Sequence, residues 1–220
     1  MQYMKFVEFI SLPKSLYFNL RVLPFNMAIK LPIFVHYNTK LYTIPPVVKI
    51  EAPIERGMIK IGFGGLTSIT SHNKNYIELG GNAELVFKGR ATISNGVALT
   101  VLGKMVVGDN FISNDNLYVS CHDEIILGDD VLFGWDVHLF DSDNHVIINV
   151  DGTEKTEHAP IRIGNHVWVG AYAHFLKGAS VSDDSVVAYK SLVTKTFDEP
   201  QIIVGGMPAK KMSKIDNWRG

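Results

Sequence analysis

Residues 163–198 read IGNHVW-VGAYAH-FLKGAS-VSDDSV-VAYKSL-VTKTFD, and they decide the fold because one pattern recurs in them every six residues. The first position of each block is apolar, and the fifth is small or β-branched in every block but the last. The first positions are Ile163, Val169, Phe175, Val181, Val187 and Val193. Neither the helical period of about 3.6 nor the strand period of about 2 brings an apolar residue to every sixth position. A chain that turns a corner every six residues brings an apolar residue to the same position of each flat segment.

Three flat segments of this length close one coil of roughly 18 residues, and stacked coils pair through their backbones about 4.8 Å apart. The first-position side chains then form a continuous core, and the narrow interior explains the small fifth position. Blocks that begin at Leu127 and Phe133 continue the pattern, and blocks at 107 and 79 do so more loosely. Gly164 and Gly170, along with the Gly-Asp, Asn-His and Asp-Asp pairs, are expected to tolerate the dihedral angles of the corners. The sequence therefore predicts an all-β protein built as a parallel β-helix.

Segments outside the repeat divide the chain into three parts. Residues 1–60 predict an N-terminal cap, residues 61–207 the β-helix domain, and residues 208–220 a short C-terminal tail. Within the domain, residues 141–160 (DSDNHVIINVDGTEKTEHAP) lack the paired small and apolar positions and predict a protruding loop. A polar excursion from a rigid scaffold is where functional residues usually lie.

The charge balance excludes one class of partner and leaves another open. The 220 residues hold 21 basic and 22 acidic side chains, which gives no general electrostatic reason to bind nucleic acid. A single cysteine and the lack of a long apolar run predict a cytoplasmic protein. Residues 1–50, however, carry six basic residues against Glu8 alone, interleaved with bulky apolar ones. One reading of this segment is a contact with the inner membrane face or with a lipid carrier. The other reading is a cap that covers the first coil.

The linked motifs IGNHVWVGA (163–171), SLVTK (191–195) and VGGMPAK (204–210) resemble those of the hexapeptide-repeat acyltransferases, over roughly residues 79–212. The stretch 108–145 is similar to the galactoside and maltose acetyltransferases, whereas FDSDNHVI (140–147) and the N-terminal extension look more like O-acetyltransferases of capsule and surface polysaccharides. The resemblance implies a left-handed parallel β-helix and a homotrimer with active sites between subunits. It also implies acetyl transfer from acetyl-CoA to a saccharide or lipid-linked saccharide, with no metal expected.

Acetyl transfer to a sugar hydroxyl needs a base that takes the hydroxyl proton, and histidine suits that task. Of eight histidines, His145 opens the polar loop and matches the general base that the resemblance implies. Asp143 or Asp141 could fix its tautomer, or both could simply solvate the loop. Asn114 matches an asparagine that positions the acceptor, with a corner asparagine in the left-handed conformation as the alternative.

A donor as long and anionic as coenzyme A needs backbone groups for its arm and cations for its phosphates. The resemblance assigns to coenzyme A the residues Trp168, Gly170, Ala171, Tyr189, Thr194, Lys195 and Lys210, with Lys211 as a spare. The alternatives are ordinary surface charge for the lysines and trimer packing for Trp168. Tyr189 and Lys190 place bulk where the family has small residues, which leaves the acyl length of the donor open.

Three other functions compete. Cys121 could act as a nucleophile beside His122, but a lone cysteine in a strand-like run is more often a small buried residue. A γ-carbonic-anhydrase-like protein would need a histidine pair five residues apart, whereas the nearest pairs here are separated by seven or eight. If the protein were a scaffold without catalytic activity, His145 and the VGGMPAK motif would have no evident function. Within acyl transfer, the acceptor could be the amine of an amino sugar instead of a hydroxyl.

Overall fold

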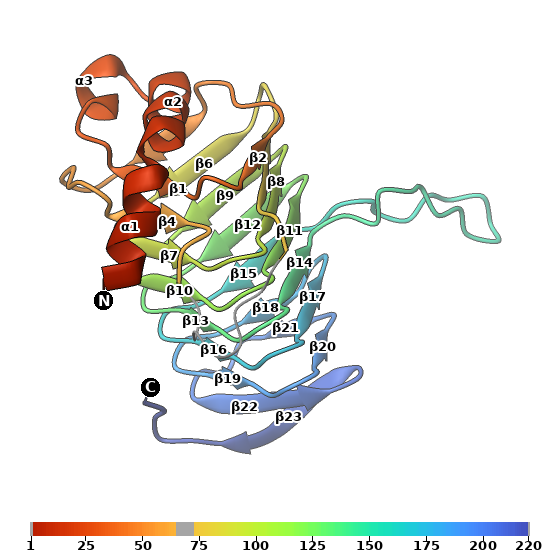
Figure 1. Ribbon diagram of the computed structural model, residues 1–220. Coiled ribbons are helices and arrows are strands. Elements are labelled where there is room, and N and C mark those ends of the chain that lie inside the picture. The colour runs from red at the N-terminus through yellow and green to blue at the C-terminus, as the bar shows by residue number, and fades with distance from the viewer. Residues whose placement is uncertain (1, 65–72, 220) are drawn as a thin grey trace.

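Three parallel sheets form the sides of a three-sided prism (Figure 1). The computed structural model describes residues 2–64 and 73–219. Sheet A contains β1 (Ile33–Val35), β4 (Ile59–Ile61), β7 (Ala91–Ile93), β10 (Phe111–Ser113), β13 (Leu132–Phe133), β16 (Trp168–Val169), β19 (Val186–Val187), β22 (Ile202–Gly206) and β23 (Ala209–Lys214). Every neighbouring pair in it is parallel except β22 and β23.

The other two sides are entirely parallel. Sheet B contains β2 (Lys40–Leu41), β5 (Tyr76–Leu79), β8 (Ala98–Val101), β11 (Tyr118–Cys121), β14 (His138–Phe140), β17 (His174–Leu176) and β20 (Leu192–Val193). Sheet C contains β3 (Val48–Ile50), β6 (Glu84–Phe87), β9 (Lys104–Val107), β12 (Glu124–Leu127), β15 (Ile161–Ile163), β18 (Ser180–Val181) and β21 (Thr196–Phe197). The chain visits A, B and C in turn, as the chain of a parallel β-helix does, and the predicted left-handed parallel β-helix is confirmed.

The core is a column of stacked apolar side chains inside the prism. All six first-position residues of 163–198 are buried, as are the fifth-position residues. Phe111 and Phe133 lie one coil apart and meet edge to face, with their ring centroids 5.1 Å apart. Phe133 pairs in register with Ser113 and Val169, so each core side chain is held between two backbone neighbours.

Of the residues expected at the corners, the polar pairs and not the two glycines provide the left-handed dihedral angles. Gly164 and Gly170 do not have a positive φ; polar residues such as Asp130 and Asp184 take the left-handed conformation instead, with φ near 55°. The glycines are needed because successive coils approach closely. A Cβ on Gly128 would lie 2.6 Å from the backbone carbonyl of Gly164 in the next coil, which is closer than such atoms come.

The N-terminal helices cover the first coil, which begins earlier than the sequence indicates. β1 already pairs with β4, so residues 33–61 belong to the β-helix and not only to a cap. The helices are α1 (Gln2–Ile10), α2 (Leu12–Val22) and α3 (Phe25–Ala28). None of the helices in the described part of the chain is long and apolar enough to cross a membrane.

Side chains of α2 pair with the open edge of β1. Asn19 Nδ2 donates to the carbonyl of Ile33 at 2.6 Å, and the N–H of Ile33 donates back to Asn19 Oδ1 at 3.2 Å. Ser15 Oγ accepts the N–H of Val35 at 2.9 Å. An unpaired strand edge invites association with another chain, and here the helix satisfies it.

Replacing Asn19 with alanine should therefore destabilise the protein. The substitution leaves two buried backbone groups of Ile33 without partners, which costs about 1–3 kcal/mol. Thermal unfolding followed by circular dichroism measures the loss, and Asn26→Ala, at an exposed position of α3, is the matched control. Equal melting temperatures for the two variants would show that the Asn19 contacts contribute nothing.

Two further irregular segments are the loop and the C-terminus. Residues 141–160 leave the prism between β14 and β15 and form a narrow two-stranded arm, with bridges Ser142–His158 and Ile148–Glu154 (Figure 1). The predicted tail begins with a strand, because β23 turns back on β22.

Candidate functional site

The three edges of the prism carry the polar candidates. We call the connections from sheet A to sheet B the AB edge, those from B to C the BC edge, and those from C to A the CA edge. Because strands of one sheet are stacked in register, residues that occupy equivalent connections line one edge from coil to coil. The edge on which a residue lies therefore decides which other residues it can meet.

His145 lies on the BC edge, in the first part of the arm. Its side chain is exposed, and Nδ1 lies 3.1 Å from the carbonyl oxygen of Asp143. Since a carbonyl can only accept a hydrogen bond, this contact favours the tautomer with the proton on Nδ1. Nε2 is then the free basic nitrogen, which is the arrangement that a general base needs.

Neither nearby carboxylate contacts the ring of His145 in the structure. Asp141 is buried and accepts the backbone N–H groups of His122 at 2.7 Å and Asp123 at 2.9 Å. Asp143 forms an ion pair with Lys177. The sequence left open whether Asp143 or Asp141 orients the ring or only solvates the loop, and in the structure the contact to Nδ1 comes from a backbone carbonyl.

Lys177 makes a contact across the arm that sequence reasoning missed. Its ammonium donates both to Asp143 Oδ2 and to the carbonyl of Thr156, which lie on opposite sides of the arm. It therefore ties the two sides together close to His145. Its only sequence signal is its place as the third residue of the repeat block FLKGAS.

Asn114 lies on the AB edge, directly after β10. It is partly buried, and its N–H donates to the carbonyl of Phe133 at 3.0 Å. The left-handed asparagine of this corner is Asn116, with φ of 62°, so the structural alternative considered for Asn114 is wrong. Sheet B separates Asn114 from His145 within one chain.

The residues assigned to the donor are divided between elements. Gly170, Ala171 and Tyr189 lie on the AB edge with Asn114, whereas Thr194 and Lys195 lie on the BC edge with His145. Trp168 lies on sheet A and Lys210 on β23. A single chain therefore does not bring the predicted set together, and the AB edge of one prism must face the BC edge of another to do so.

Successive coils approach closely along the AB edge, so side chains do not fit at its glycines. A Cβ on Gly134 would lie 2.5 Å from the nitrogen of Ala171, and one on Gly170 would lie 2.8 Å from the nitrogen of Tyr189. The bulky side chains that depart from the family pattern point along this edge. Tyr172 and Tyr189 meet edge to face at 5.5 Å, and Lys190 Nζ lies 5.5 Å from the Tyr189 ring.

The candidate cations differ in their partners. Lys195 Nζ lies over the ring of Phe197 at 5.3 Å, and Lys210 is exposed. Neither forms an ion pair within the described part of the chain, so both are available to an anion. Lys211 is paired with Glu199, which argues against its use as a spare phosphate ligand.

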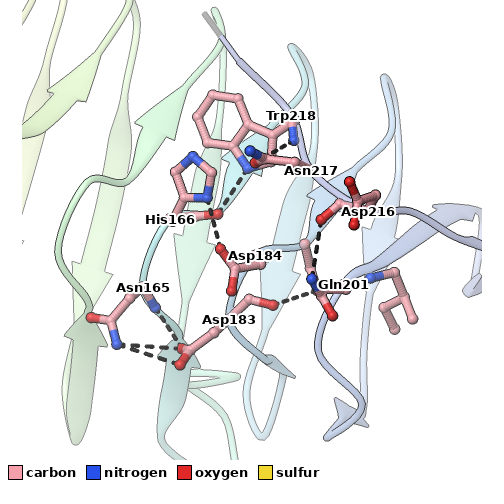
Figure 2. Close-up of polar contacts among 10 residues, drawn as sticks. Asn165, His166, Asp183, Asp184, Gln201, Asp216, Asn217 and Trp218 are labelled. Atoms are coloured by element: carbon pink, nitrogen blue, oxygen red, sulfur yellow. Dashed lines mark hydrogen bonds and ion pairs between the residues drawn. The ribbon is translucent and has the colours of Figure 1, made fainter.

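The C-terminal tail packs on the β-helix through Trp218, which lies against His166 (Figure 2). Trp218 stacks on His166 with ring centroids 4.4 Å apart, and its Nε1 donates to the carbonyl of His166 at 2.8 Å. Asp184 fixes His166 from the other side through Nδ1 at 2.8 Å. Trp218 also lies 6.2 Å from Trp168. Trp218 was not predicted as a site residue, although a lone aromatic residue in a polar tail is a sign that the tail packs against the domain.

The competing nucleophile is inaccessible. Cys121 is fully buried, and its Sγ contacts the carbonyl of Lys104 at 3.2 Å. Burial, together with the nearby charge of Asp141, raises the pKa of the Cys121 thiol well above its ordinary value. A buried thiol that does not ionise is a structural residue and not a nucleophile.

The other histidines that the structure describes do not form a zinc site. His138 and His174 stack on the outer face of sheet B with centroids 4.3 Å apart, and His122 and His158 stack at 6.1 Å. Within residues 2–64 and 73–219, no three histidine, cysteine or acidic side chains are grouped so that they could hold a metal ion.

Comparison with known proteins agrees with the resemblance seen in the motifs. No protein-family model matches the sequence. The galactoside O-acetyltransferase of Escherichia coli (strain K12) is 30% identical over 111 residues, which are 50% of this chain and 54% of that protein. The chloramphenicol acetyltransferase of Klebsiella aerogenes is 48% identical over 52 residues, 24% of either chain. The predicted similarity to galactoside acetyltransferases is therefore confirmed.

A solved structure supports the fold independently. The polySia-specific acetyltransferase NeuO matches with a TM-score of 0.54 and 24% identity, over 86% of this chain and 79% of that one. At this identity the match establishes the shared fold. By sequence, the chain spans about half the length of the first curated relatives that it matches.

Proposed function

We propose that this protein is an acetyl-CoA-dependent O-acetyltransferase of saccharides, and that it works as a homotrimer with an active site between each pair of subunits. One observation carries the proposal: the catalytic candidates lie on two different edges of the prism. His145, Thr194 and Lys195 lie on the BC edge, and Asn114 and Gly170 lie on the AB edge. Two neighbouring subunits can combine these edges, whereas one subunit cannot.

The outer faces of the prism support such a contact. Sheet C is covered by ion pairs, including Arg162 with Glu124 at 2.5 Å and Lys49 with Glu84 at 2.6 Å, and this suits a face in water. Sheet B instead presents a row of rings in contact, in which His174 stacks on His138 and Tyr118 is tilted against it. Aromatic residues are enriched in interfaces and charged residues are depleted, so sheet B and its edges are the side that suits a neighbouring subunit.

The proposed reaction uses His145 as the general base. Nε2 accepts the proton of the acceptor hydroxyl while the hydroxyl oxygen bonds to the carbonyl carbon of the acetyl group. The carbon–sulfur bond then breaks, and the imidazolium returns the proton to the departing sulfur. The carbonyl of Asp143 contacts Nδ1 at 3.1 Å and stabilises the positive ring between these two steps.

The donor suits the groups available along both edges. The resemblance assigns the amide-containing arm of the donor to Gly170 and Ala171 on the AB edge, where Gly170 is buried and Ala171 is partly exposed. Lys195 and Lys210 carry no acidic partner in the described part of the chain and would bind phosphates. Trp168 and Trp218 would form the wall beside them.

Subunit complementation tests this arrangement. His145→Ala and Asn114→Ala are each expected to be poorly active, but mixed trimers contain interfaces that combine an intact BC edge with an intact AB edge. Random assembly in a ring of three should restore roughly a quarter of the normal activity. Ala171→Arg, which blocks the AB edge, can replace Asn114→Ala. Failure to recover activity in demonstrably mixed trimers would contradict a site shared between chains.

An acceptor screen tests the reaction itself. Purified protein and acetyl-CoA are incubated with neutral, acidic and amino sugars and with chloramphenicol, and free thiol release is measured. We expect transfer to hydroxyl groups of saccharides. Transfer confined to amino sugars would replace O-acetylation with N-acetylation, and no thiol release with any acceptor would contradict the proposed function.

A further inference from the structure

A groove of about 760 Å³ lies between the N-terminal helices and the first coil, outside the site described above. We call it the cap groove. Its polar and aromatic lining residues are Lys14, Tyr17, Tyr37, Thr39, Lys40 and Tyr42. Ligand pockets in proteins occupy roughly 300–1,000 Å³, so the cap groove has the size of a binding site.

The charge of the cap groove is wholly positive. Lys14 and Lys40 line it, no acidic residue does, and neither lysine has an ion-pair partner among the described residues. Lys14 Nζ donates to the carbonyl of Thr39 at 2.6 Å, which fixes the ammonium and leaves its other N–H groups for a ligand. Burial lowers the pKa of Lys14, as expected for a cation without a counter-charge.

The walls of the cap groove are tyrosine rings. Tyr17, Tyr37 and Tyr42 are 54%, 49% and 61% exposed, although large aromatic side chains are usually more buried. Two of them are held in place from behind. Tyr37 packs against His36 with centroids 4.5 Å apart, and Tyr42 stacks on Tyr76 at 6.2 Å. Rings that are exposed yet fixed offer flat apolar surfaces with a hydroxyl at the rim.

One buried polar group of the groove lining has no partner among residues 2–64 and 73–219. Thr39 is 1% exposed, and its Oγ1 makes no hydrogen bond to these residues. Buried hydroxyl groups are normally bonded, so this one marks a place where the surroundings are incomplete. It lies in the same residue whose carbonyl positions Lys14.

We propose that the cap groove binds acidic saccharide, with the carboxylate of a sugar unit on Lys14 and Lys40 and the sugar rings against the tyrosines. A flat membrane would contact protruding groups, such as Phe9 and Phe25 on the helices, whereas Lys14 is partly buried inside a concave surface. Membrane contact by residues 1–50 stays a separate prediction, and it is one outcome of the test below.

The position of the cap groove connects it to the proposed active site, and this step rests on the proposed function. Thr39 and Asn114 lie on the same AB edge, three coils apart. At about 4.8 Å per coil, the separation is about 14 Å, which an oligosaccharide of a few units can bridge. One acidic chain could therefore lie in the groove while another of its units reaches the catalytic residues.

Equilibrium binding tests the groove without relying on catalysis. Isothermal titration in the absence of acetyl-CoA uses short oligomers of galacturonic acid and N-acetylneuraminic acid, with maltotriose as the neutral control. We expect the acidic oligomers to bind and maltotriose to bind at least tenfold more weakly. Binding should fall at least tenfold in Lys14→Met/Lys40→Gln and in Tyr42→Ala. Lys30→Gln and Phe25→Ala, at exposed cap positions outside the groove, are the matched controls.

Three results would overturn the proposal. They are equal binding of neutral and acidic oligomers, unchanged binding in the groove variants, and no oligosaccharide binding while phosphatidylglycerol vesicles bind through Lys14 and Lys40. A kinetic measurement distinguishes failure of this proposal from failure of the proposed function. The groove variants should raise KM for long acidic acceptors but not for monosaccharides, with kcat unchanged, and His145→Ala should still bind the oligomers.

Discussion

Replacing His145 with alanine should lower kcat/KM for acetyl transfer by about 10²- to 10⁴-fold, the range typical for loss of a general base. The side chain is exposed on the arm, and its one hydrogen bond in the structure is to the carbonyl of Asp143. Its removal leaves no buried group unpaired, so the fold should be unchanged. Thiol release under saturating donor measures the rate, and circular dichroism confirms the fold.

His122→Ala and His158→Ala are matched controls for this substitution. Both residues lie at the same edge, and their rings stack on each other 6.1 Å apart. We expect each of these variants to keep activity within a few-fold of the unmodified protein. Near-normal transfer in a correctly folded His145→Ala variant would remove His145 from the mechanism, and an equal loss in all three would indicate damage to the arm instead.

Much of the fold could be predicted because the sequence period and the coil geometry coincide. The block length places Ile163 and Val181 in one sheet, one coil apart, and both are buried. The same counting would have placed Asn114 and His145 on different edges, which the motifs alone did not suggest. The first coil could not be found in this way, because the connections on either side of β2 and β3 interrupt the period.

Contacts between distant segments account for what the sequence could not provide. The pairing of Asn19 with the edge of β1, the link from Lys177 across the arm and the stacking of Trp218 on His166 all join residues at least 14 positions apart. Local preference contains no information about such pairs. The corner glycines were predicted for the wrong reason, since close approach of the next coil can be seen only once the coils are stacked.

Replacing Phe133 with alanine should cost about 3–5 kcal/mol of stability, which is the usual range for truncating a buried phenylalanine. Phe133 is fully buried and packs edge to face on Phe111. The cavity cannot close easily, because backbone pairing with the coils on both sides fixes the spacing around it. We therefore expect a cost in the upper part of that range.

Thermal unfolding provides the measurement. A domain of this size loses about 2–4 °C of melting temperature per kcal/mol, so the midpoint should fall by roughly 6–20 °C. Phe25→Ala makes the same truncation at a residue that is 71% exposed, and it should shift the midpoint by no more than about 2 °C. A solenoid transmits such a loss mainly to neighbouring coils, so hydrogen exchange should accelerate first in β10, β13 and β16. A shift equal to that of Phe25→Ala would mean that the phenylalanine column does not hold the coils together.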